Sequence, residues 1–122
     1  MTVLIVEDEA ITAMVLAHRL EDLGYVVIGT AASGKQACDL ATTHRPEAIV
    51  MDIGLTGEMD GVAAATYIRR EINAPIVFAS GYNTPEMLER TRAIPNAAFT
   101  GKPTDPQKIH ALFQQLVAAA ES

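Results

Sequence analysis

Tryptophan is absent from this sequence and aromatic residues make up only 5% of it, so the core has to be built mainly from aliphatic side chains. Cysteine occurs once, at Cys38, which excludes an internal disulfide and fits a reducing compartment. No apolar run approaches the roughly 20 residues that a membrane-spanning helix needs. The first residues also lack the basic segment that opens a signal peptide. We therefore expect no membrane insertion and a cytoplasmic location.

Basic residues are scarce, because nine Lys and Arg stand against 15 Asp and Glu, for a net charge of -6. Nucleic-acid binding needs clustered basic residues, so nucleic acid is not an expected partner. An acidic chain suits Mg²⁺ or a basic protein partner better. With 122 residues, 49% of them hydrophobic, and no linker, repeat or low-complexity tract, the chain is expected to form one domain over residues 1–122.

Short apolar runs alternate along the chain with segments of helical spacing. The apolar runs predict strands at 3–6, 26–30, 48–51, 75–79 and 97–100. The helical segments predict one helix with apolar positions from Ala13 to Leu23, one from Ser33 to about Thr43, one from Asp60 to about Arg70, a short or loosely packed one after Thr84, and a last one from Asp105. Strands that are continuous apolar runs suit a parallel sheet covered on both faces. Five strand–helix units therefore predict a doubly wound α/β fold.

Polar side chains follow four of the five predicted strands directly. They are Glu7, Asp8 and Glu9 after the first strand, Asp52 after the third, Ser80 after the fourth and Lys102 after the fifth. The second strand is followed by nothing reactive. Because parallel strands end at the same edge of their sheet, we expect these groups to converge there.

The chemistry of this set is that of a cation and phosphate site. Crowded carboxylates form an oxygen-rich site suited to Mg²⁺, and without metal at least one of them should have a raised pKa. With Mg²⁺ nearby, an Asp such as Asp52 can act as a nucleophile toward phosphorus. Lys102 and the hydroxyl of Ser80 are suitable donors to phosphoryl oxygens.

The order of these residues resembles the receiver domain of two-component response regulators, of the single-domain chemotaxis-regulator type. The resemblance covers essentially the whole chain, and the stretch Phe78–Tyr82 resembles the Phe-Ala-Thr-Gly-Tyr variant of one receiver subgroup. It implies a flavodoxin-like sheet with strand order 2-1-3-4-5, flanked by five helices. It also implies that Asp52 accepts a phosphoryl group from a histidine kinase or a phosphotransfer protein.

The resemblance further assigns roles around Asp52. Asp8, Asp52 and the backbone carbonyl of Gly54 would ligate Mg²⁺ directly, and Glu7 would help through water. Lys102, preceding a cis-proline bond, would pair with the phosphoryl group, and Ser80 would move toward it. Phe99 occupies the place of the switch aromatic but lacks a hydroxyl, so a switch there has to be steric. For Phe99, a core role and a switch role stay equally open.

The function that follows is a phosphorylation-controlled protein-binding switch for an unknown downstream target. Its output would leave through the fourth helix, fifth strand and fifth helix, and it would be no enzyme beyond its own phosphorylation and dephosphorylation. One alternative is a pseudo-receiver that binds partners without phosphorylation. A flavodoxin-like cofactor carrier is disfavoured because the acids at 7–9 would repel phosphate. A small phosphatase lacks a visible second nucleophile.

The remaining side chains have ordinary expected roles. Cys38 should be a small core residue. Tyr25 and Tyr67 should pack partly buried, and Arg69 and Arg70 should form a solvated helix end. The three histidines show no metal-ligand spacing and are expected at the surface (His18, His44 and His110).

Overall fold

Five strands and five helices alternate strictly along the chain in the computed structural model, which describes residues 1–81 and 84–121. The strands are β1 (Thr2–Val6), β2 (Val26–Ala31), β3 (Ala48–Asp52), β4 (Ile76–Ser80) and β5 (Ala97–Gly101). The helices are α1 (Ala10–Asp22), α2 (Gly34–His44), α3 (Gly61–Arg69), α4 (Pro85–Arg92) and α5 (Pro106–Ala120). Each predicted element is present, within a few residues of the predicted bounds.

All five strands are parallel and form one sheet in the order β2-β1-β3-β4-β5. The predicted doubly wound fold and its strand order are therefore confirmed. The register aligns the carboxyl ends of the inner strands, because Val6 lies beside Met51 and Asp52 beside Ala79. Ser80 in turn lies beside Gly101. Residues that follow these strands consequently meet at one edge.

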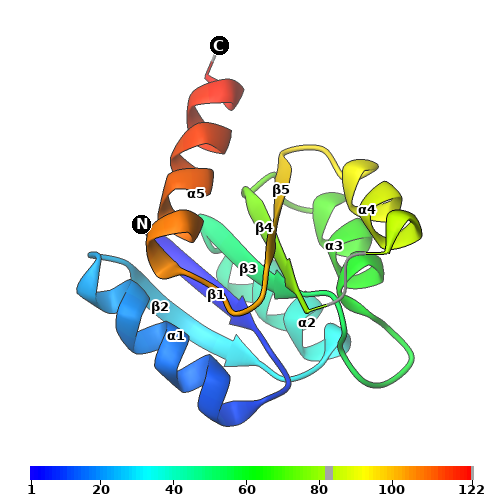
Figure 1. Cartoon of the computed structure of the whole chain (residues 1–122), viewed down its shortest axis with the longest axis horizontal. Coiled ribbons are helices and arrows are strands. Elements are labelled where there is room, and N and C mark those ends of the chain that lie inside the picture. The colour runs from blue at the N-terminus through cyan, green and yellow to red at the C-terminus, as the bar shows by residue number, and fades with distance from the viewer. Residues whose placement is uncertain (82–83, 122) are drawn as a thin grey trace.

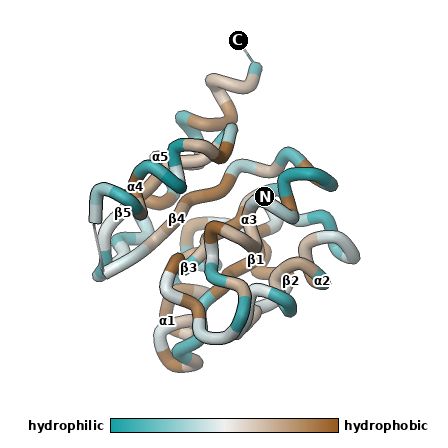
Figure 2. The backbone as a smooth tube through the Cα atoms, turned by 90° about the vertical axis from the view of Figure 1, so that its right-hand side faces the viewer, coloured by the Kyte–Doolittle hydropathy of each residue, from teal (hydrophilic) through white to brown (hydrophobic). Residues whose placement is uncertain are grey.

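Helices cover both faces of the sheet (Figure 1). On one face, α1 and α5 bury residues such as Leu20 and Phe113 against β1, β3 and β4. On the other face, α2 and α3 bury residues such as Ala41 and Ile68. Burial on both faces explains why β3 and β4 are apolar throughout until a polar residue at the last position of each. Figure 2 shows this contrast, with hydrophobic colour along the central strands and hydrophilic colour over much of α4.

Helix boundaries follow from local chemistry in the sequence. The Ser33 hydroxyl accepts a hydrogen bond from the Gln36 N–H at 3.1 Å, and the Gln36 side chain accepts one from the Ala32 N–H at 2.8 Å. This is the expected capping box, shifted by one residue on its return bond. Asp60, Thr84 and Asp105 cap α3, α4 and α5 by accepting one backbone N–H each. The capping side chains of these four helices were therefore predictable from the sequence, whereas α1 begins without a side-chain cap.

Several smaller expectations are settled by the fold. Cys38 is buried in α2, as predicted, and Tyr25 is buried more fully than predicted. Tyr67 is 46% exposed, so its predicted packing role is wrong. Tyr67 lies on α3 one position before buried Ile68, on the side of the helix that the sheet does not cover.

Two basic side chains also depart from the predicted solvated state. Arg69 is half-buried and donates hydrogen bonds to the carbonyls of Pro95 at 3.0 Å and Ala74 at 2.7 Å. It joins the two loops that enter β4 and β5, so the predicted solvated helix end is wrong for Arg69. His110 lies 2.7 Å through its Nδ1 from the Tyr25 hydroxyl, and is therefore a packing partner as well as a surface residue.

In the part of the chain that the structure describes, no helix has both the length and the apolar character needed to cross a membrane.

Candidate phosphoryl-acceptor site

The candidate site lies at the carboxyl edge of the sheet and draws one polar residue from each of four adjacent strands. Glu7 directly follows β1, and Asp52 is the last residue of β3. Ser80 ends β4, and Lys102 directly follows β5. Since β1, β3, β4 and β5 are neighbours in the sheet, residues up to 95 positions apart in sequence are brought into contact.

Three carboxylates form the acidic part of the site. One ligand oxygen from each of Glu7, Asp8 and Asp52 lies within 4.8 Å of the others. Glu7 and Asp52 are each only 6% exposed, while Asp8 is half-buried and reaches toward solvent. Glu9, the third acid of the run, is exposed and belongs to the start of α1 rather than to this cluster.

Lys102 partly neutralises the cluster. Its Nζ lies 2.9 Å from Glu7 Oε1 and 3.2 Å from Asp52 Oδ2. Burial disfavours the ammonium, but the hydrogen bond to Glu7 and the charge of Asp52 outweigh burial and raise the pKa of Lys102 above its ordinary value. Lys102 is therefore a fixed positive charge beside Asp52. The Lys102–Pro103 peptide is cis, as expected.

Glu7 is the carboxylate of this group whose environment most disfavours its charged form. Burial, followed by the close approach of Asp52, raises the pKa of Glu7 to about 7, and Lys102 only partly offsets this effect. The expectation that one crowded carboxylate would have a raised pKa is confirmed. Among the described residues, Glu7 Oε2 is also the buried side-chain atom that lacks a hydrogen-bond partner. A buried oxygen without a donor, beside two more carboxylates, fits a hard divalent cation such as Mg²⁺.

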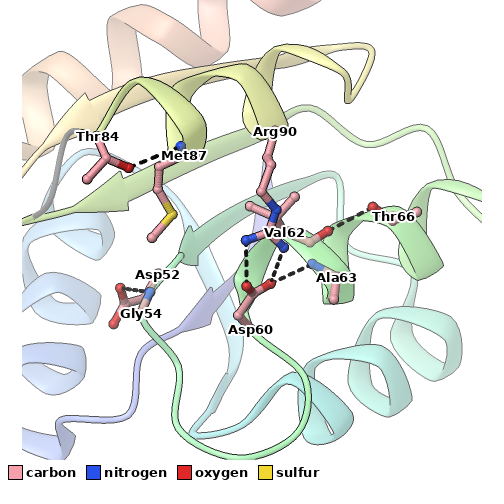
Figure 3. Close-up of polar contacts among 9 residues, drawn as sticks. All are labelled: Asp52, Gly54, Asp60, Val62, Ala63, Thr66, Thr84, Met87 and Arg90. Atoms are coloured by element: carbon pink, nitrogen blue, oxygen red, sulfur yellow. Dashed lines mark hydrogen bonds and ion pairs between the residues drawn. The ribbon is translucent and has the colours of Figure 1, made fainter.

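The loop after β3 folds tightly back onto Asp52. The Gly54 N–H donates to Asp52 Oδ1 at 3.1 Å, as Figure 3 shows. The Gly61 N–H donates to the Ile53 carbonyl at 3.1 Å. A Cβ on Gly61 would clash with the Asp52 carbonyl oxygen, so only glycine fits at this close approach. The Asp52 side chain is thus held in place by the backbone that follows it.

The two predicted switch residues lie on neighbouring strands. Ser80 is buried at the end of β4, and its carbonyl accepts a hydrogen bond from the Lys102 N–H at 2.9 Å. Phe99 is half-buried in β5 beside Phe78, and lines a hollow of about 290 Å³ between β5 and α4. Its packing against the core is consistent with a core role, and the hollow leaves space for a steric role. Tyr82, the last residue of the Phe78–Tyr82 variant, lies outside the described residues.

Sequence reasoning missed an apolar ridge beside the site. Ile11, Met14 and Val15, at the start of α1, are 74%, 54% and 45% exposed. A hollow of about 420 Å³ on one side of the ridge reaches Lys102, and one of about 410 Å³ on the other reaches Asp8. The signal was available, because these residues fall outside the buried stripe that includes Leu16 and Leu20.

The fold and this arrangement together define a doubly wound α/β domain with a buried carboxylate, flanking acids and an inward-facing lysine at the carboxyl edge of a flavodoxin-like sheet. The comparison with known families agrees. The chain belongs to the response regulator receiver domain family, whose model matches residues 3–114.

Curated relatives carry the same domain within longer chains. The transcriptional regulatory protein PdtaR of Mycobacterium tuberculosis is 38% identical over 101 residues, which cover 83% of this chain and 49% of that protein. The phyllosphere-induced regulator PhyR of Methylorubrum extorquens is 33% identical over 122 residues, covering 98% of this chain and 45% of PhyR. The chain thus spans about half the length of these relatives. The extent of one domain over 1–122 stays a prediction.

Solved structures share the fold over nearly the whole chain. The signal receiver domain of a modulated diguanylate cyclase from Desulfovibrio desulfuricans has a TM-score of 0.89 at 31% identity, covering 98% of this chain and 95% of that one. The Vibrio cholerae chemotaxis protein CheY4 has a TM-score of 0.80 at 28% identity, covering 94% and 97%. The predicted likeness to chemotaxis regulators is therefore confirmed at the level of the fold.

Proposed function

We propose that this receiver domain accepts a phosphoryl group on Asp52, with Mg²⁺, from a histidine kinase or a phosphotransfer protein. Modification then changes which proteins the domain binds. The observation that carries this proposal is the position of Asp52 between two acids that can bind a divalent cation and a lysine that can bind phosphoryl oxygens. Its ligand oxygen lies within 4.8 Å of those of Glu7 and Asp8, and its Oδ2 lies 3.2 Å from Lys102 Nζ.

The residues present fit a magnesium ion. Asp8 and Asp52 would hold it directly with the Gly54 carbonyl, and Glu7 would stand beside it through water. Mg²⁺ bound there would supply positive charge against the equatorial oxygens of the transferred group. The same charge would favour the ionised form of Glu7, whose pKa is otherwise raised to about 7.

The chain's own groups account for the rest of the reaction. The Asp52 carboxylate attacks phosphorus, forming a P–O bond as the P–N bond of the donor phosphohistidine breaks, and the imidazole nitrogen keeps the electron pair. Lys102 Nζ moves from carboxylate oxygens to a phosphoryl oxygen. The Ser80 hydroxyl donates to another oxygen and draws the end of β4 toward Asp52. Hydrolysis of the new bond returns the domain to its first state, and we propose no other enzymatic turnover.

Labelling with a small phosphodonor tests this proposal. Incubation with Mg²⁺ and acetyl phosphate should add about one phosphoryl group per chain, measured by intact mass. Asp52→Asn should abolish the gain, because the amide is no nucleophile toward phosphorus. Asp39→Asn, at an exposed aspartate of α2, is the matched control and should label normally. Full labelling of Asp52→Asn would remove Asp52 as acceptor, and a folded wild type that never labels would favour a phosphorylation-independent binding module.

The apolar ridge of α1 gives the protein donor a place to bind. A phosphohistidine can reach Asp52 only if its protein docks at the carboxyl edge, and the exposed ridge residues Ile11, Met14 and Val15 lie there. Contiguous exposed apolar side chains mark such contact sites. For the output side we propose the face of α4, β5 and α5, which includes Phe99 and adjoins Ser80. We also propose that the protein works in the cytoplasm, where kinases of this type would present their phosphohistidine.

A further inference from the structure

Helix α4 is the one helix of the described structure whose buried residues include no apolar side chain. Of its eight residues, only Thr91 is buried, and Thr91 is polar. Helix α3, by comparison, buries five of nine residues. Figure 2 shows hydrophilic colour over much of α4, in keeping with its polar sequence. Elements with few buried apolar contacts open at low free-energy cost, so the position of α4 depends strongly on its polar tethers.

The tether in question is the ion pair between Arg90 and Asp60. Arg90 donates from Nη1 to Asp60 Oδ2 at 2.8 Å and from Nη2 to Asp60 Oδ1 at 3.1 Å, which is a bidentate arrangement. Asp60 Oδ1 also accepts the Ala63 N–H at 2.9 Å as the N-cap of α3. Figure 3 shows Arg90 reaching down from α4 to this one carboxylate.

The Asp60 end of the pair is rigid. Burial alone would raise the pKa of Asp60, but the hydrogen bonds from Arg90 and Ala63 prevail and lower it, so the pair is fully charged at neutral pH. The next residue, Gly61, packs against the Asp52 carbonyl so closely that a Cβ would clash. Its N–H is bonded to the Ile53 carbonyl at 3.1 Å. The position of Asp60 is therefore fixed, through Gly61, relative to the backbone of Asp52 and Ile53.

The other end of α4 is joined to the site through Ser80. The N-cap Thr84 follows Ser80 by four positions in the sequence. Met87, in the first turn, extends from α4 toward Asp52 and Gly54 in Figure 3 and packs against the core. Helix α4 thus begins four positions after the predicted switch residue and is held near its other end by Arg90.

We propose that the Arg90–Asp60 pair is a latch that holds α4 in its unphosphorylated position. Phosphorylation moves Ser80 and the start of α4, and the latch opposes that movement. Its strength sets how much of the population has a displaced α4 before phosphorylation. This inference rests on the proposed function for its trigger, but the restraint itself exists in the unmodified protein.

Hydrogen–deuterium exchange of the unmodified protein tests the latch. Asp60→Asn keeps an oxygen to cap α3 and removes the charge, and Arg90→Gln removes the other partner. Both should speed exchange of the amides at 88–92 by about fivefold, the factor expected for a well-formed exposed pair. Arg92→Gln, at an exposed arginine of the same helix, is the matched control and should leave exchange unchanged. The double variant Asp60→Asn/Arg90→Gln should resemble either single variant.

A second measurement connects the latch to phosphorylation. With Mg²⁺ and acetyl phosphate, wild-type α4 should exchange faster than before, and Asp60→Asn should show a smaller further increase because its helix is already released. Exchange of residues 88–92 that is the same in wild type, Asp60→Asn and Arg90→Gln before phosphorylation overturns the latch. A wild type that gains no mass overturns the proposed function instead, so the two failures are distinguishable.

Discussion

Gly61 shows how one residue can set the geometry of the site at the carboxyl edge of the sheet. It has no side chain at the one point where α3 begins against the Asp52 carbonyl. The close approach lets the chain turn back over β3 immediately after Asp52, so that Gly54 donates to the Asp52 side chain and Asp60 stands beside Arg90. A larger residue would push the start of α3 away from the site.

Gly61→Ala should therefore destabilise the fold by about 2 kcal/mol or more, because the new Cβ meets backbone that cannot rotate away. Urea unfolding followed by circular dichroism measures the change. Gly101→Ala is the control, since a Cβ there meets nothing within 4 Å, and its effect should stay within about 0.5 kcal/mol. Equal stability of the two variants would contradict the close packing at Gly61.

At the scale of elements, α1 and α4 both begin at the carboxyl edge but expose different chemistry. The start of α1 is apolar and exposed at Ile11, Met14 and Val15. Helix α4 is polar and held by an ion pair between Arg90 and Asp60. Binding surfaces that exclude water need apolar side chains, while an element that moves needs few of them. The two helices are accordingly suited to docking and to switching.

Ile11→Lys should slow phosphorylation by a protein donor about tenfold and leave labelling by acetyl phosphate unchanged, because it disturbs docking and not the acceptor. The donor is a phosphotransfer protein first shown to label the wild type, and the rates are followed by intact mass. Val26→Lys changes an apolar residue that is 60% exposed on the edge strand β2, and it should have no effect on either donor. Equal loss with both donors would show that Ile11→Lys damages the site itself.

For the whole molecule, the crowded charges of the site lower the free energy of unfolding when no metal is bound. Two carboxylates and an ammonium are brought together where Glu7 and Asp52 are each 6% exposed. The pKa of Glu7 in the fold is about 7, above its ordinary 4.5. The folded protein thus binds this proton more tightly than the unfolded chain does, so stability falls as the pH rises from 4.5 to about 7 and levels off above that.

Without divalent cations, the melting temperature should consequently fall between pH 5 and pH 7 and level off by pH 8. Glu7→Gln should flatten this fall and be more stable than wild type at pH 8, since its amide carries no charge to bury and can still accept from Lys102. Thermal melts in EDTA measure both proteins, and their difference cancels the titration of the histidines. Adding Mg²⁺ should restore wild-type stability at pH 8 more than that of Glu7→Gln. Parallel pH profiles of the two proteins would contradict the raised pKa of Glu7.

Much of this structure could be predicted from the sequence because the determining signals are local. Apolar runs marked the strands, and the capping residues Ser33, Asp60, Thr84 and Asp105 marked where helices begin. Parallel strands then bring their ends to one edge, which predicts that Asp52 lies beside Glu7 and Lys102, as it does. The raised pKa of one acid followed from that crowding.

What only the tertiary structure decided depends on distances between residues far apart in the chain. Arg69 binds the Ala74 and Pro95 carbonyls, where a solvated side chain was predicted. Arg90 pairs with Asp60, which lies 30 positions earlier in the sequence. Tyr67 is exposed on the side of α3 that faces away from the sheet. The sequence alone determined which elements form and at which edge the chemistry gathers, because backbone periodicity and capping act over a few residues. Which charges pair across elements was left to packing, because the energy of an ion pair depends on ångström separations and on burial that no local pattern encodes.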